Sequence, residues 1–140
     1  MKMTIEIHTL NDLPIAAMRF LEETNDRKIF AFSGEMGAGK TTFILSLLQA
    51  MGVEDRQGSP TYSLVNSYNT PAFGKMYHFD LFRLQSEEEA FDIGIEEMLY
   101  GDGYCFIEWP EKIANLLPEH TIWVTINVNE RGERKISIDI

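Results

Sequence analysis

One stretch constrains the fold of this chain more than any other, and it lies at residues 28–42, Lys-Ile-Phe-Ala-Phe-Ser-Gly-Glu-Met-Gly-Ala-Gly-Lys-Thr-Thr. The pattern G-x-x-x-x-G-K-S/T of a phosphate-binding loop is matched here by Gly34, Gly39, Lys40 and Thr41. Glycines let the backbone turn with positive φ and bring its N–H groups close to phosphate oxygens. A lysine at the end of such a loop can reach the β and γ oxygens, and the next hydroxyl can coordinate Mg²⁺. The stretch therefore predicts a binding site for a nucleoside triphosphate.

The residues on both sides of the loop support this interpretation. Residues 29–32 form a short apolar run, which is typical of a buried strand. After the loop, Phe43, Leu47 and Met51 recur with helical spacing, and Gly52 fits a C-cap. The predicted helix would direct the positive end of its dipole at the phosphates. Because strand, loop and helix follow in this order, a simple glycine-rich turn with a surface lysine is disfavoured.

The remaining chain alternates predicted strands and helices. Further strands are expected at residues 3–8, 64–68, 75–84, 104–107, 122–128 and 135–140. Further helices are expected at residues 12–24, 86–93, 95–100 and 111–117. The last two strands should form a hairpin joined by residues 129–134. We therefore expect one domain over residues 1–140, an α/β fold of the three-layer type seen in P-loop nucleoside triphosphatases, with a partly parallel core sheet and antiparallel marginal strands.

Two predicted helices carry more detailed signals. Ser86 and Glu89 fit a capping box, with Ser86 as N-cap and Glu89 at N3. That helix should end near Gly94, and its apolar residues are Ala90, Phe91 and Ile93. The apolar face of the first helix is expected to consist of Ile15, Met18, Phe20 and Leu21.

Charge and cysteine content exclude several kinds of function. The chain has 12 Lys and Arg against 22 Asp and Glu, a net charge of −10, so it lacks a broad basic surface for gripping nucleic acid by itself. The single cysteine, Cys105, excludes an internal disulfide, and its apolar neighbours predict a buried thiol. A signal peptide and a membrane-spanning apolar run are both absent from the sequence, so a cytoplasmic location without membrane association is expected.

Two acids are candidates for the chemistry around a terminal phosphate. Glu108 closes the apolar run 104–107, at the strand end where a Mg²⁺ or water contact belongs. Asp80 is expected in the middle of the strand 75–84, where a carboxylate is costly without a cation or donor. The alternative for Glu108 is a solvated strand end. For Asp80 the alternatives are an ion pair with Arg83 or a hydrogen bond to His78.

Three other residues are weaker candidates. Thr61 follows a proline in a loop and could touch the γ-phosphate or the metal, which would let it distinguish triphosphate from diphosphate. Alternatively, its hydroxyl only stabilises a turn. His78 could orient Asp80, although a single strand histidine is more often structural, and Trp109 could either pack or contact a ligand.

Four segments in order give the chain a specific family resemblance. They are residues 34–42, Ser-Pro-Thr-Tyr-Ser-Leu-Val at 59–65, Tyr-His-Phe-Asp-Leu-Phe-Arg-Leu at 77–84 and Ile-Glu-Trp-Pro-Glu at 107–111. Together they resemble the TsaE family, formerly YjeE, the bacterial P-loop ATPase required for threonylcarbamoyladenosine modification of tRNA. Phe82 stands where the family usually has tyrosine, so the aromatic ring is kept and any role of the hydroxyl is lost.

The resemblance implies a cofactor, a metal and a set of site residues. ATP and Mg²⁺ are the implied ligands, with the metal held by Thr41 and Glu108, and catalytic roles fall to Asp80, Lys40 and Thr61, the last in a switch-like loop. The turn at Gly132, in the C-terminal hairpin, is implied to approach the nucleotide. The full set of implied nucleotide-binding residues is Gly34, Glu35, Met36, Gly37, Ala38, Gly39, Lys40, Thr41, Thr42 and Gly132.

The resemblance also implies partners. The family acts with two proteins that carry out threonylcarbamoyl transfer, and ATP turnover is thought to reset that assembly. The acidic net charge is compatible with this arrangement, because the partners would hold most of the tRNA.

Three other functions compete with an ATPase. A small-molecule kinase needs an acceptor pocket and a lid with phosphate-binding arginines, and 12 Lys and Arg leave little for either. A Ras-like GTPase needs Asn-Lys-x-Asp to read guanine, and this string does not occur, which favours adenine. A nucleotide-dependent interaction module without turnover stays open.

Overall fold

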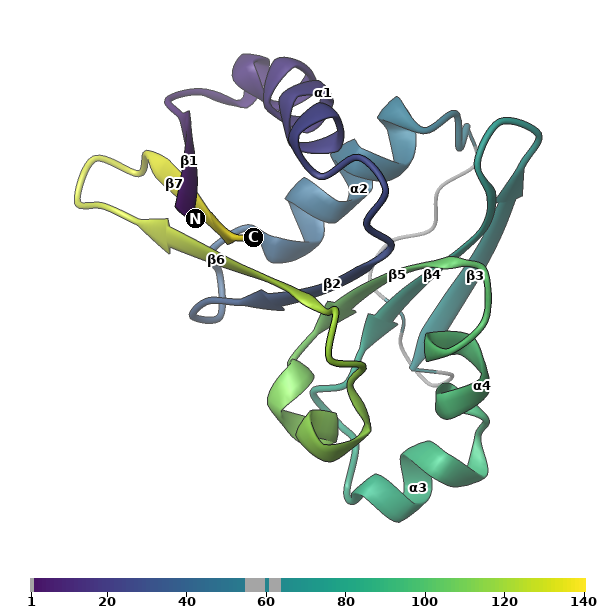
Figure 1. The fold of residues 1–140 in the computed structure, drawn as a ribbon. Coiled ribbons are helices and arrows are strands. Elements are labelled where there is room, and N and C mark those ends of the chain that lie inside the picture. The colour runs from purple at the N-terminus through teal and green to yellow at the C-terminus, as the bar shows by residue number, and fades with distance from the viewer. Residues whose placement is uncertain (1, 55–59, 61–63) are drawn as a thin grey trace.

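The fold is built on one mixed β-sheet. The computed structural model describes residues 2–54, 60 and 64–140. Within these residues the strands are β1 (Lys2–Ile7), β2 (Ile29–Ser33), β3 (Val65–Thr70), β4 (Gly74–Asp80), β5 (Tyr104–Glu108), β6 (Ile122–Val128) and β7 (Arg134–Asp139). They form a seven-stranded sheet in the order β1-β7-β6-β2-β5-β4-β3 (Figure 1).

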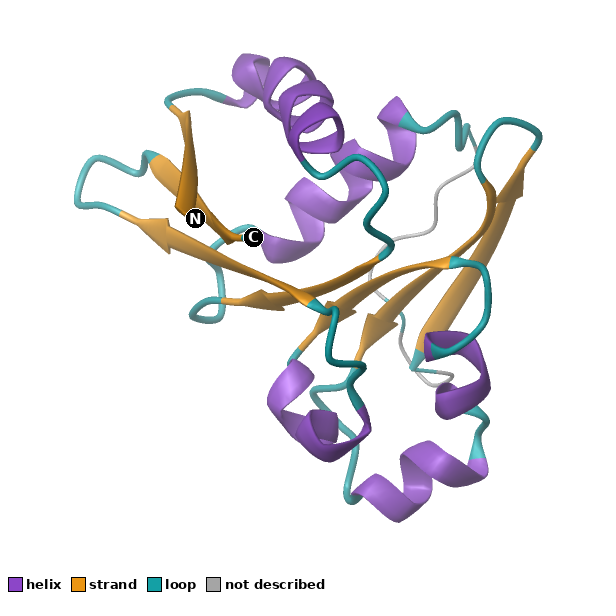
Figure 2. Cartoon of the chain, viewed as in Figure 1, coloured by secondary structure: helices purple, strands orange, loops and turns teal. Residues whose placement is uncertain are grey.

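Helices cover both faces of this sheet and complete three layers. In the described part of the chain they are η1 (Leu10–Asp12), α1 (Leu13–Glu23), α2 (Lys40–Ala50), α3 (Glu87–Asp92), α4 (Ile95–Leu99) and η2 (Pro110–Leu116). Helices α1 and α2 lie over one face, called here the first face, and α3, α4 and η2 lie over the second face (Figure 2). No helix in residues 2–54, 60 and 64–140 has the length and apolar character needed to span a bilayer.

The centre of the sheet is parallel and its margins are antiparallel, as the sequence predicts. Strand β2 runs parallel to both β5 and β6, and β4 runs parallel to β5. At the margins β3 pairs antiparallel with β4, and β7 pairs antiparallel with β6 and β1. The central strands are buried on both faces, which explains the unbroken apolar runs of β2 and β5.

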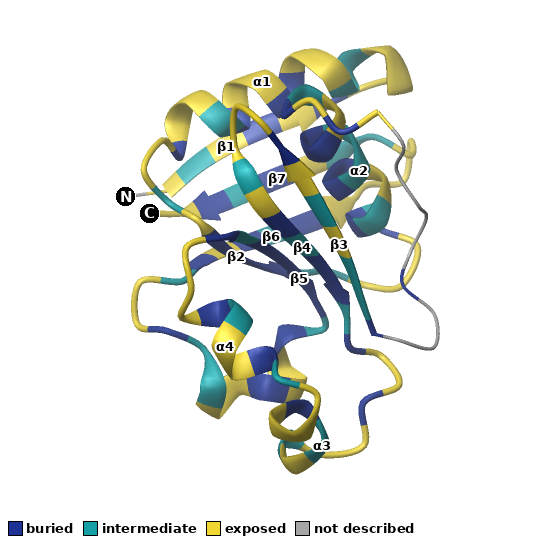
Figure 3. Cartoon of the chain, turned by 90° about the vertical axis from the view of Figure 1, so that its right-hand side faces the viewer, coloured by how far each residue is buried: buried dark blue, intermediate teal, exposed yellow. Residues whose placement is uncertain are grey.

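Aromatic side chains dominate the core beneath the first face. Phe30 and Phe106 stack with ring centroids 5.6 Å apart, and Phe20 meets Phe43 edge-on at 5.5 Å. Each such pair contributes about 0.5–1.5 kcal/mol beyond simple burial. Figure 3 shows the buried strands of the sheet between the partly exposed helical layers. This packed layer is the support on which α2 rests.

The core beneath the second face is mainly aliphatic. It includes Leu81, Ile95, Leu99 and Ile107, together with the thiol of Cys105. Cys105 is fully buried, as the sequence predicts, and this burial raises the pKa of its thiol to about 12. The thiol is therefore protonated throughout the neutral pH range.

The predicted apolar face of α1 is confirmed at Phe20 and Leu21 and wrong at Ile15 and Met18. Ile15 and Met18 are 74% and 51% exposed, whereas Ala16, Ala17 and Phe20 are buried. Apolar residues occur around most of this helix, so spacing alone could not choose the side that packs. The small alanines are the ones that face the core, where α1 packs against α2 and β1.

Three short segments also differ from the sequence prediction. Phe91 is 62% exposed although Ala90 beside it is buried, because α3 is only six residues long and presents little surface to the core. The predicted helix at 111–117 is a 3₁₀ segment, η2, interrupted at Ile113. Strand β4 ends at Asp80 rather than continuing to residue 84, and a turn follows it.

The capping prediction at α3 holds for its first half. Ser86 is the N-cap, and its hydroxyl accepts a hydrogen bond from Glu89 N at 3.2 Å. The carboxylate of Glu89 accepts from Gln85 N at 3.0 Å rather than from Ser86 N. Both bonds still fix the start of the helix.

Candidate functional site

A cavity of about 490 Å³ opens at the carboxyl ends of the parallel strands β4 and β5. This is the edge of an α/β sheet where ligands bind, and the volume lies within the roughly 300–1,000 Å³ of ordinary small-ligand sites. Its lining combines the loop before α2 with strand ends and the last hairpin: Met36, Gly37, Gly39, Lys40, Thr41, Thr42, Pro60, Asp80, Phe82, Arg83, Glu108, Trp109 and Arg134.

The glycines of the loop are required by its backbone. Gly34, Gly37 and Gly39 have φ values of 155°, 85° and 95°, in the region that favours glycine. A Cβ on Gly34 would lie 2.7 Å from Ile126 O, and one on Gly39 would lie 2.5 Å from Arg134 Nε. Gly39 is also the N-cap of α2, so the loop ends where the helix begins. The positive end of the helix dipole thus faces the cavity.

Lys40 is a buried cation at the N-terminus of α2. Its side chain lines the cavity although the residue is only 5% exposed. The ammonium donates to Gly34 O at 2.8 Å and lies 3.8 Å from the centre of the Trp109 ring. Burial lowers the pKa of Lys40, and the neighbouring carboxylates, Glu108 first among them, oppose this shift. A carbonyl oxygen and an aromatic face are both favourable neighbours for a cation.

Thr41 and Glu108 are in direct contact across the site. The Thr41 hydroxyl is 2.9 Å from Glu108 Oε1 and 2.8 Å from Oε2, so its proton is shared between the two carboxylate oxygens. Glu108 is the last residue of β5 and is only 3% exposed. The alternative of a solvated strand end is therefore wrong for Glu108.

His78 contacts Glu108 and not Asp80. Its Nε2 lies 2.7 Å from Glu108 Oε2, and its ring is fully buried. The prediction that His78 orients Asp80 is wrong, because the parallel register of β4 and β5 brings Glu108 within reach of the ring.

Asp80 lies at a strand end, next to Glu108. Since β4 ends there, its carboxylate is half-buried rather than enclosed in mid-strand. In the register of the sheet Asp80 is directly opposite Glu108, and Asp80 Oδ1 accepts a hydrogen bond from Phe82 N at 3.2 Å. Two carboxylates from adjacent strands thus line one cavity.

An aromatic pair forms one wall of the cavity. Trp109 has a φ of 60°, an uncommon value for a residue with a bulky side chain. Its ring lies 5.1 Å from that of Phe82, and both residues line the cavity. Trp109 therefore both packs and faces the space that a ligand would enter.

The last hairpin reaches the loop through Arg134, a residue that the sequence analysis missed. Arg134 Nε donates to Ala38 O at 2.9 Å, and the residue lines the cavity. Gly132, the hairpin residue predicted to bind nucleotide, has a φ of 81° in the turn and is not among the lining residues. An arginine at the end of a predicted hairpin connection gives no sequence signal of a contact to a loop 96 positions earlier.

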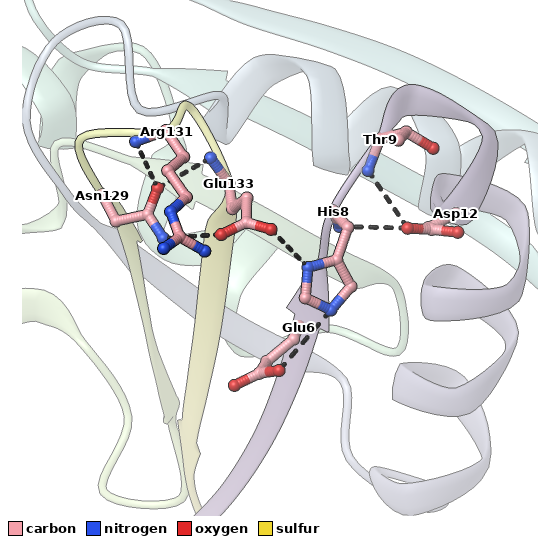
Figure 4. Close-up of polar contacts among 7 residues, drawn as sticks. All are labelled: Glu6, His8, Thr9, Asp12, Asn129, Arg131 and Glu133. Carbon is pink, nitrogen blue, oxygen red and sulfur yellow. Dashed lines mark hydrogen bonds and ion pairs between the residues drawn. The ribbon is translucent and has the colours of Figure 1, made fainter.

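The tip of this hairpin is bound to the end of β1. His8 Nδ1 lies 2.7 Å from Glu133 Oε2, and Asn129 side-chain bonds shape the turn around Arg131 (Figure 4). The bond to Glu133 raises the pKa of His8, while the bonds from Asn129 and His8 lower the pKa of Glu133. Asp12 accepts from His8 N and closes the other side of this exposed group.

The other predicted site residues fall into two groups. Among the nucleotide-binding candidates, Met36 and Thr42 line the cavity, whereas Glu35 and Ala38 line a smaller hollow that faces β6. Thr61 lies outside the described residues, although Pro60 beside it lines the cavity.

The oxygen ligands of the site fit a magnesium ion that arrives with a nucleotide. Mg²⁺ prefers hydroxyl and carboxylate oxygens, and in phosphate sites it keeps waters and takes only one or two carboxylates. Thr41 and Glu108 supply such oxygens within one contact. No group of three His, Cys, Asp or Glu side chains that could hold a metal ion occurs among the described residues.

Sequence comparisons point to one family. Residues 7–136 match the family model described as Threonylcarbamoyl adenosine biosynthesis protein TsaE. The Treponema pallidum tRNA threonylcarbamoyladenosine biosynthesis protein TsaE is 38% identical over 120 residues, covering 86% of this chain and 85% of its own. The protein of that name from Haemophilus influenzae is 47% identical over 96 residues, covering 68% of this chain and 60% of its own. The one from Rickettsia prowazekii is 35% identical over 136 residues, covering 94% of this chain and 93% of its own.

A solved structure shares the fold. The crystal structure of YdiB from Bacillus subtilis superposes with a TM-score of 0.77 at 22% identity, and the match covers 99% of this chain and 84% of that one. At this level of identity the likeness speaks for the architecture.

Proposed function

The chain belongs to the TsaE family, and from this membership and the geometry of the cavity we propose that it binds and hydrolyses ATP with Mg²⁺. We propose further that this activity serves the threonylcarbamoyl modification of a tRNA adenosine, in keeping with the names of its relatives. In this role the chain acts with a partner complex that performs the transfer.

One observation carries the ATPase proposal: the contact between the Thr41 hydroxyl and both oxygens of Glu108, at 2.9 and 2.8 Å. A loop threonine and a buried acid at a neighbouring strand end are the two protein groups that a P-loop site uses for Mg²⁺. When bound, the ion would neutralise charge that develops on the β and γ oxygens.

The surrounding residues would bind the phosphates, orient a water molecule and exclude solvent. Backbone N–H groups of the loop and of the first turn of α2 would bind the phosphates, and the Lys40 ammonium, which now donates to Gly34 O, would donate to phosphate oxygens. Asp80 is opposite Glu108 and lines the same cavity, and it would orient an attacking water. The Trp109 and Phe82 rings exclude solvent on one side.

The partner assignment rests on charge and on family membership. With a net charge of −10 the chain repels a polyanion, so a complex with tRNA needs partners that hold most of the nucleic acid. By the family resemblance, Thr61 belongs to a switch-like loop that would distinguish the triphosphate from the diphosphate. Partner binding is then tighter with a non-hydrolysable ATP analogue than with ADP, and Thr61→Ala narrows this difference.

The deciding experiment measures ATP turnover by the purified chain alone, with the cognate transferase pair, and with the pair and tRNA. We expect slow turnover alone and stimulation by the partners, because charges around a solvent-open γ-phosphate are incompletely positioned. Competition between ATP and GTP tests the base, with ATP preferred. Nucleotide-dependent partner binding without turnover in any mixture would instead identify an interaction module, and preference for GTP would contradict the ATPase assignment.

A further inference from the structure

A buried histidine beside the site carries an unsatisfied polar atom. His78 is fully buried in β4, and its Nδ1 has no hydrogen-bond partner among the described residues. Leaving such an atom unpaired is costly, and natural proteins contain few of them. The other contacts of His78 should therefore explain why a polar side chain occupies this buried position.

The other ring nitrogen of His78 makes one short contact. Nε2 lies 2.7 Å from Glu108 Oε2, the same carboxylate oxygen that Thr41 Oγ1 approaches to 2.8 Å. Glu108 thus lies between a donor from β4 and a donor from the start of α2. The contact to Thr41 alone would leave the carboxylate free to rotate about the shared hydroxyl proton.

The two donors of Glu108 differ in the tasks they can perform. Thr41 is itself a candidate metal ligand, so its position would change with the ion and the phosphates. His78 lies two residues before Asp80 on β4, in the register position opposite Phe106, and is enclosed by the sheet and the core. Its ring is a fixed donor that does not depend on the ligand.

We propose that His78 is a positioning residue for the metal site: its Nε2–H holds the Glu108 carboxylate toward Thr41, in the orientation that a Mg²⁺-bound nucleotide requires. This inference rests on the proposed ATP-binding function. An ionised carboxylate can only accept, so Nε2 carries the proton and Nδ1 is the bare nitrogen.

The proposal explains why the site tolerates the unsatisfied atom. Residues that orient a metal ligand without touching the metal often change metal affinity by about 10–100-fold when replaced. A core residue of similar volume without a donor would pack equally well, but it would release Glu108. The polar ring is therefore retained for its contact to Glu108.

The test compares three histidine variants. His78→Leu removes the donor, His78→Gln places an amide N–H near the position of Nε2, and His120→Gln alters an exposed histidine outside the cavity as the control. Binding of a fluorescent ATP analogue is titrated at fixed nucleotide with increasing Mg²⁺, and separately with a chelator in place of the metal. Thermal unfolding of each variant is recorded alongside.

We expect His78→Leu to raise the Mg²⁺ concentration at half-saturation about 10–100-fold, with metal-free nucleotide affinity within about twofold of wild type. His78→Gln should restore most of the Mg²⁺ response, and His120→Gln should leave it unchanged. A purely structural role predicts lower unfolding temperatures for His78→Leu with an unaltered Mg²⁺ half-saturation, and this result would overturn the proposal.

A second readout does not require any variant to fold. Two-dimensional ¹H–¹⁵N spectra of the imidazole rings of the wild-type protein should show a protonated Nε2 and an unprotonated Nδ1 for His78. The opposite tautomer would overturn the proposal directly. If the wild type bound no nucleotide with or without Mg²⁺, the proposed function itself would fail, and the positioning role with it; normal wild-type binding with an unaltered His78→Leu Mg²⁺ response would remove the positioning role alone.

Discussion

Two cavities open at opposite ends of the parallel strands, and the smaller one holds the candidate site. The cavity at the carboxyl ends has a volume of about 490 Å³, and the one at the amino ends of β4 and β5 has about 740 Å³. The amino-end cavity is lined by Lys28, Lys75, Tyr77 and Glu97 among others, and several glycines complete it. Size therefore does not distinguish the two, and the difference lies in the chemistry of their walls.

One lysine in each cavity makes nearly the same contacts. Lys40 Nζ donates to Gly34 O at 2.8 Å and lies 3.8 Å from the Trp109 ring centre, while Lys28 Nζ donates to Asp102 O at 2.9 Å and lies 5.4 Å from the Tyr104 ring centre. Lys28 is exposed to solvent, whereas Lys40 is buried at the first residue of α2. A carbonyl oxygen and an aromatic ring beside a lysine are therefore not enough to predict a phosphate site. Lys40 differs from Lys28 because it is buried and lies at a helix N-terminus.

The largest expected effect concerns the one cysteine, which lies near the amino-end cavity. Cys105 Sγ contacts Met98 O at 3.5 Å, and Met98 lines that cavity. Because burial raises the pKa of Cys105 from 9.0 to about 12, its thiolate fraction at pH 8 falls about 1,000-fold. We expect thiol-reagent labelling of the native protein at pH 8 to be slower than that of the urea-unfolded chain by at least this factor.

Rapid labelling of the native protein would instead show that the amino-end cavity opens as far as β5.

The pKa shift of Cys105 also predicts a pH dependence of stability. The unfolded chain releases the Cys105 proton near pH 9.0 and the folded chain keeps it to about pH 12. Free energy of unfolding therefore falls as pH rises through this window, and Cys105→Ala should reduce that loss.

The next effect contrasts the two lysines. Lys40→Ala removes the cation nearest the predicted β and γ phosphates, and Mg·ATP affinity should fall about 100-fold, from loss of charged hydrogen bonds worth about 1.5–3 kcal/mol each. Lys28→Ala should leave the affinity unchanged, although its contacts resemble those of Lys40. Isothermal titration of both variants measures this difference, and equal losses would place the phosphate site elsewhere.

A smaller effect contrasts two glutamates, one from each cavity. Glu108→Gln removes a negative charge from the candidate metal site, so ATP turnover should need about tenfold more Mg²⁺. Glu97→Gln, at the exposed rim of the amino-end cavity, should give wild-type behaviour. ATP turnover of both variants, measured against Mg²⁺ concentration, tests this prediction. If Glu108→Gln matched the wild type, Asp80 would be the better candidate ligand.

The smallest expected effect is a difference between two adjacent residues of β5 whose side chains lie on opposite faces of the sheet. Phe106 and Ile107 are adjacent in β5 and belong to the cores of the first and second faces. Phe106→Leu and Ile107→Val should each lower the free energy of unfolding by about 1 kcal/mol. Only Phe106→Leu, opposite His78 in the register, should also shift the Mg²⁺ half-saturation, by about threefold. Denaturant titrations and metal titrations provide the two measurements.

The sequence was sufficient for the loop, the parallel centre of the sheet and the position of Glu108 at a strand end. Glycine spacing predicts the turn at Gly34 and Gly39 because few other residues fit those backbone angles. Unbroken apolar runs predict β2 and β5, since parallel strands are buried on both faces. An acid directly after such a run, Glu108, is then placed at the ligand edge of the sheet by the topology alone.

Contacts between distant segments were beyond the sequence. The bond from His78 to Glu108 depends on which strands are neighbours and on their register, and a local pattern specifies neither. Arg134 reaches Ala38 for the same reason. The exposed side of α1, with Ile15 and Met18, was mistaken because apolar residues surround that helix and tertiary packing selects the face.

The position of β7 in the sheet has a consequence for biosynthesis. Within the described residues β1 has β7 as its only neighbour in the strand order, so two strands far apart in the sequence must pair. Arg134, the first residue of β7, also supplies the bond to Ala38 in the loop before α2. A nascent chain that stops short of β7 leaves the edge of β6 unpaired, which favours aggregation. We therefore expect β1 to pair only after β7 has been synthesised, and such long-range pairing to make folding slow.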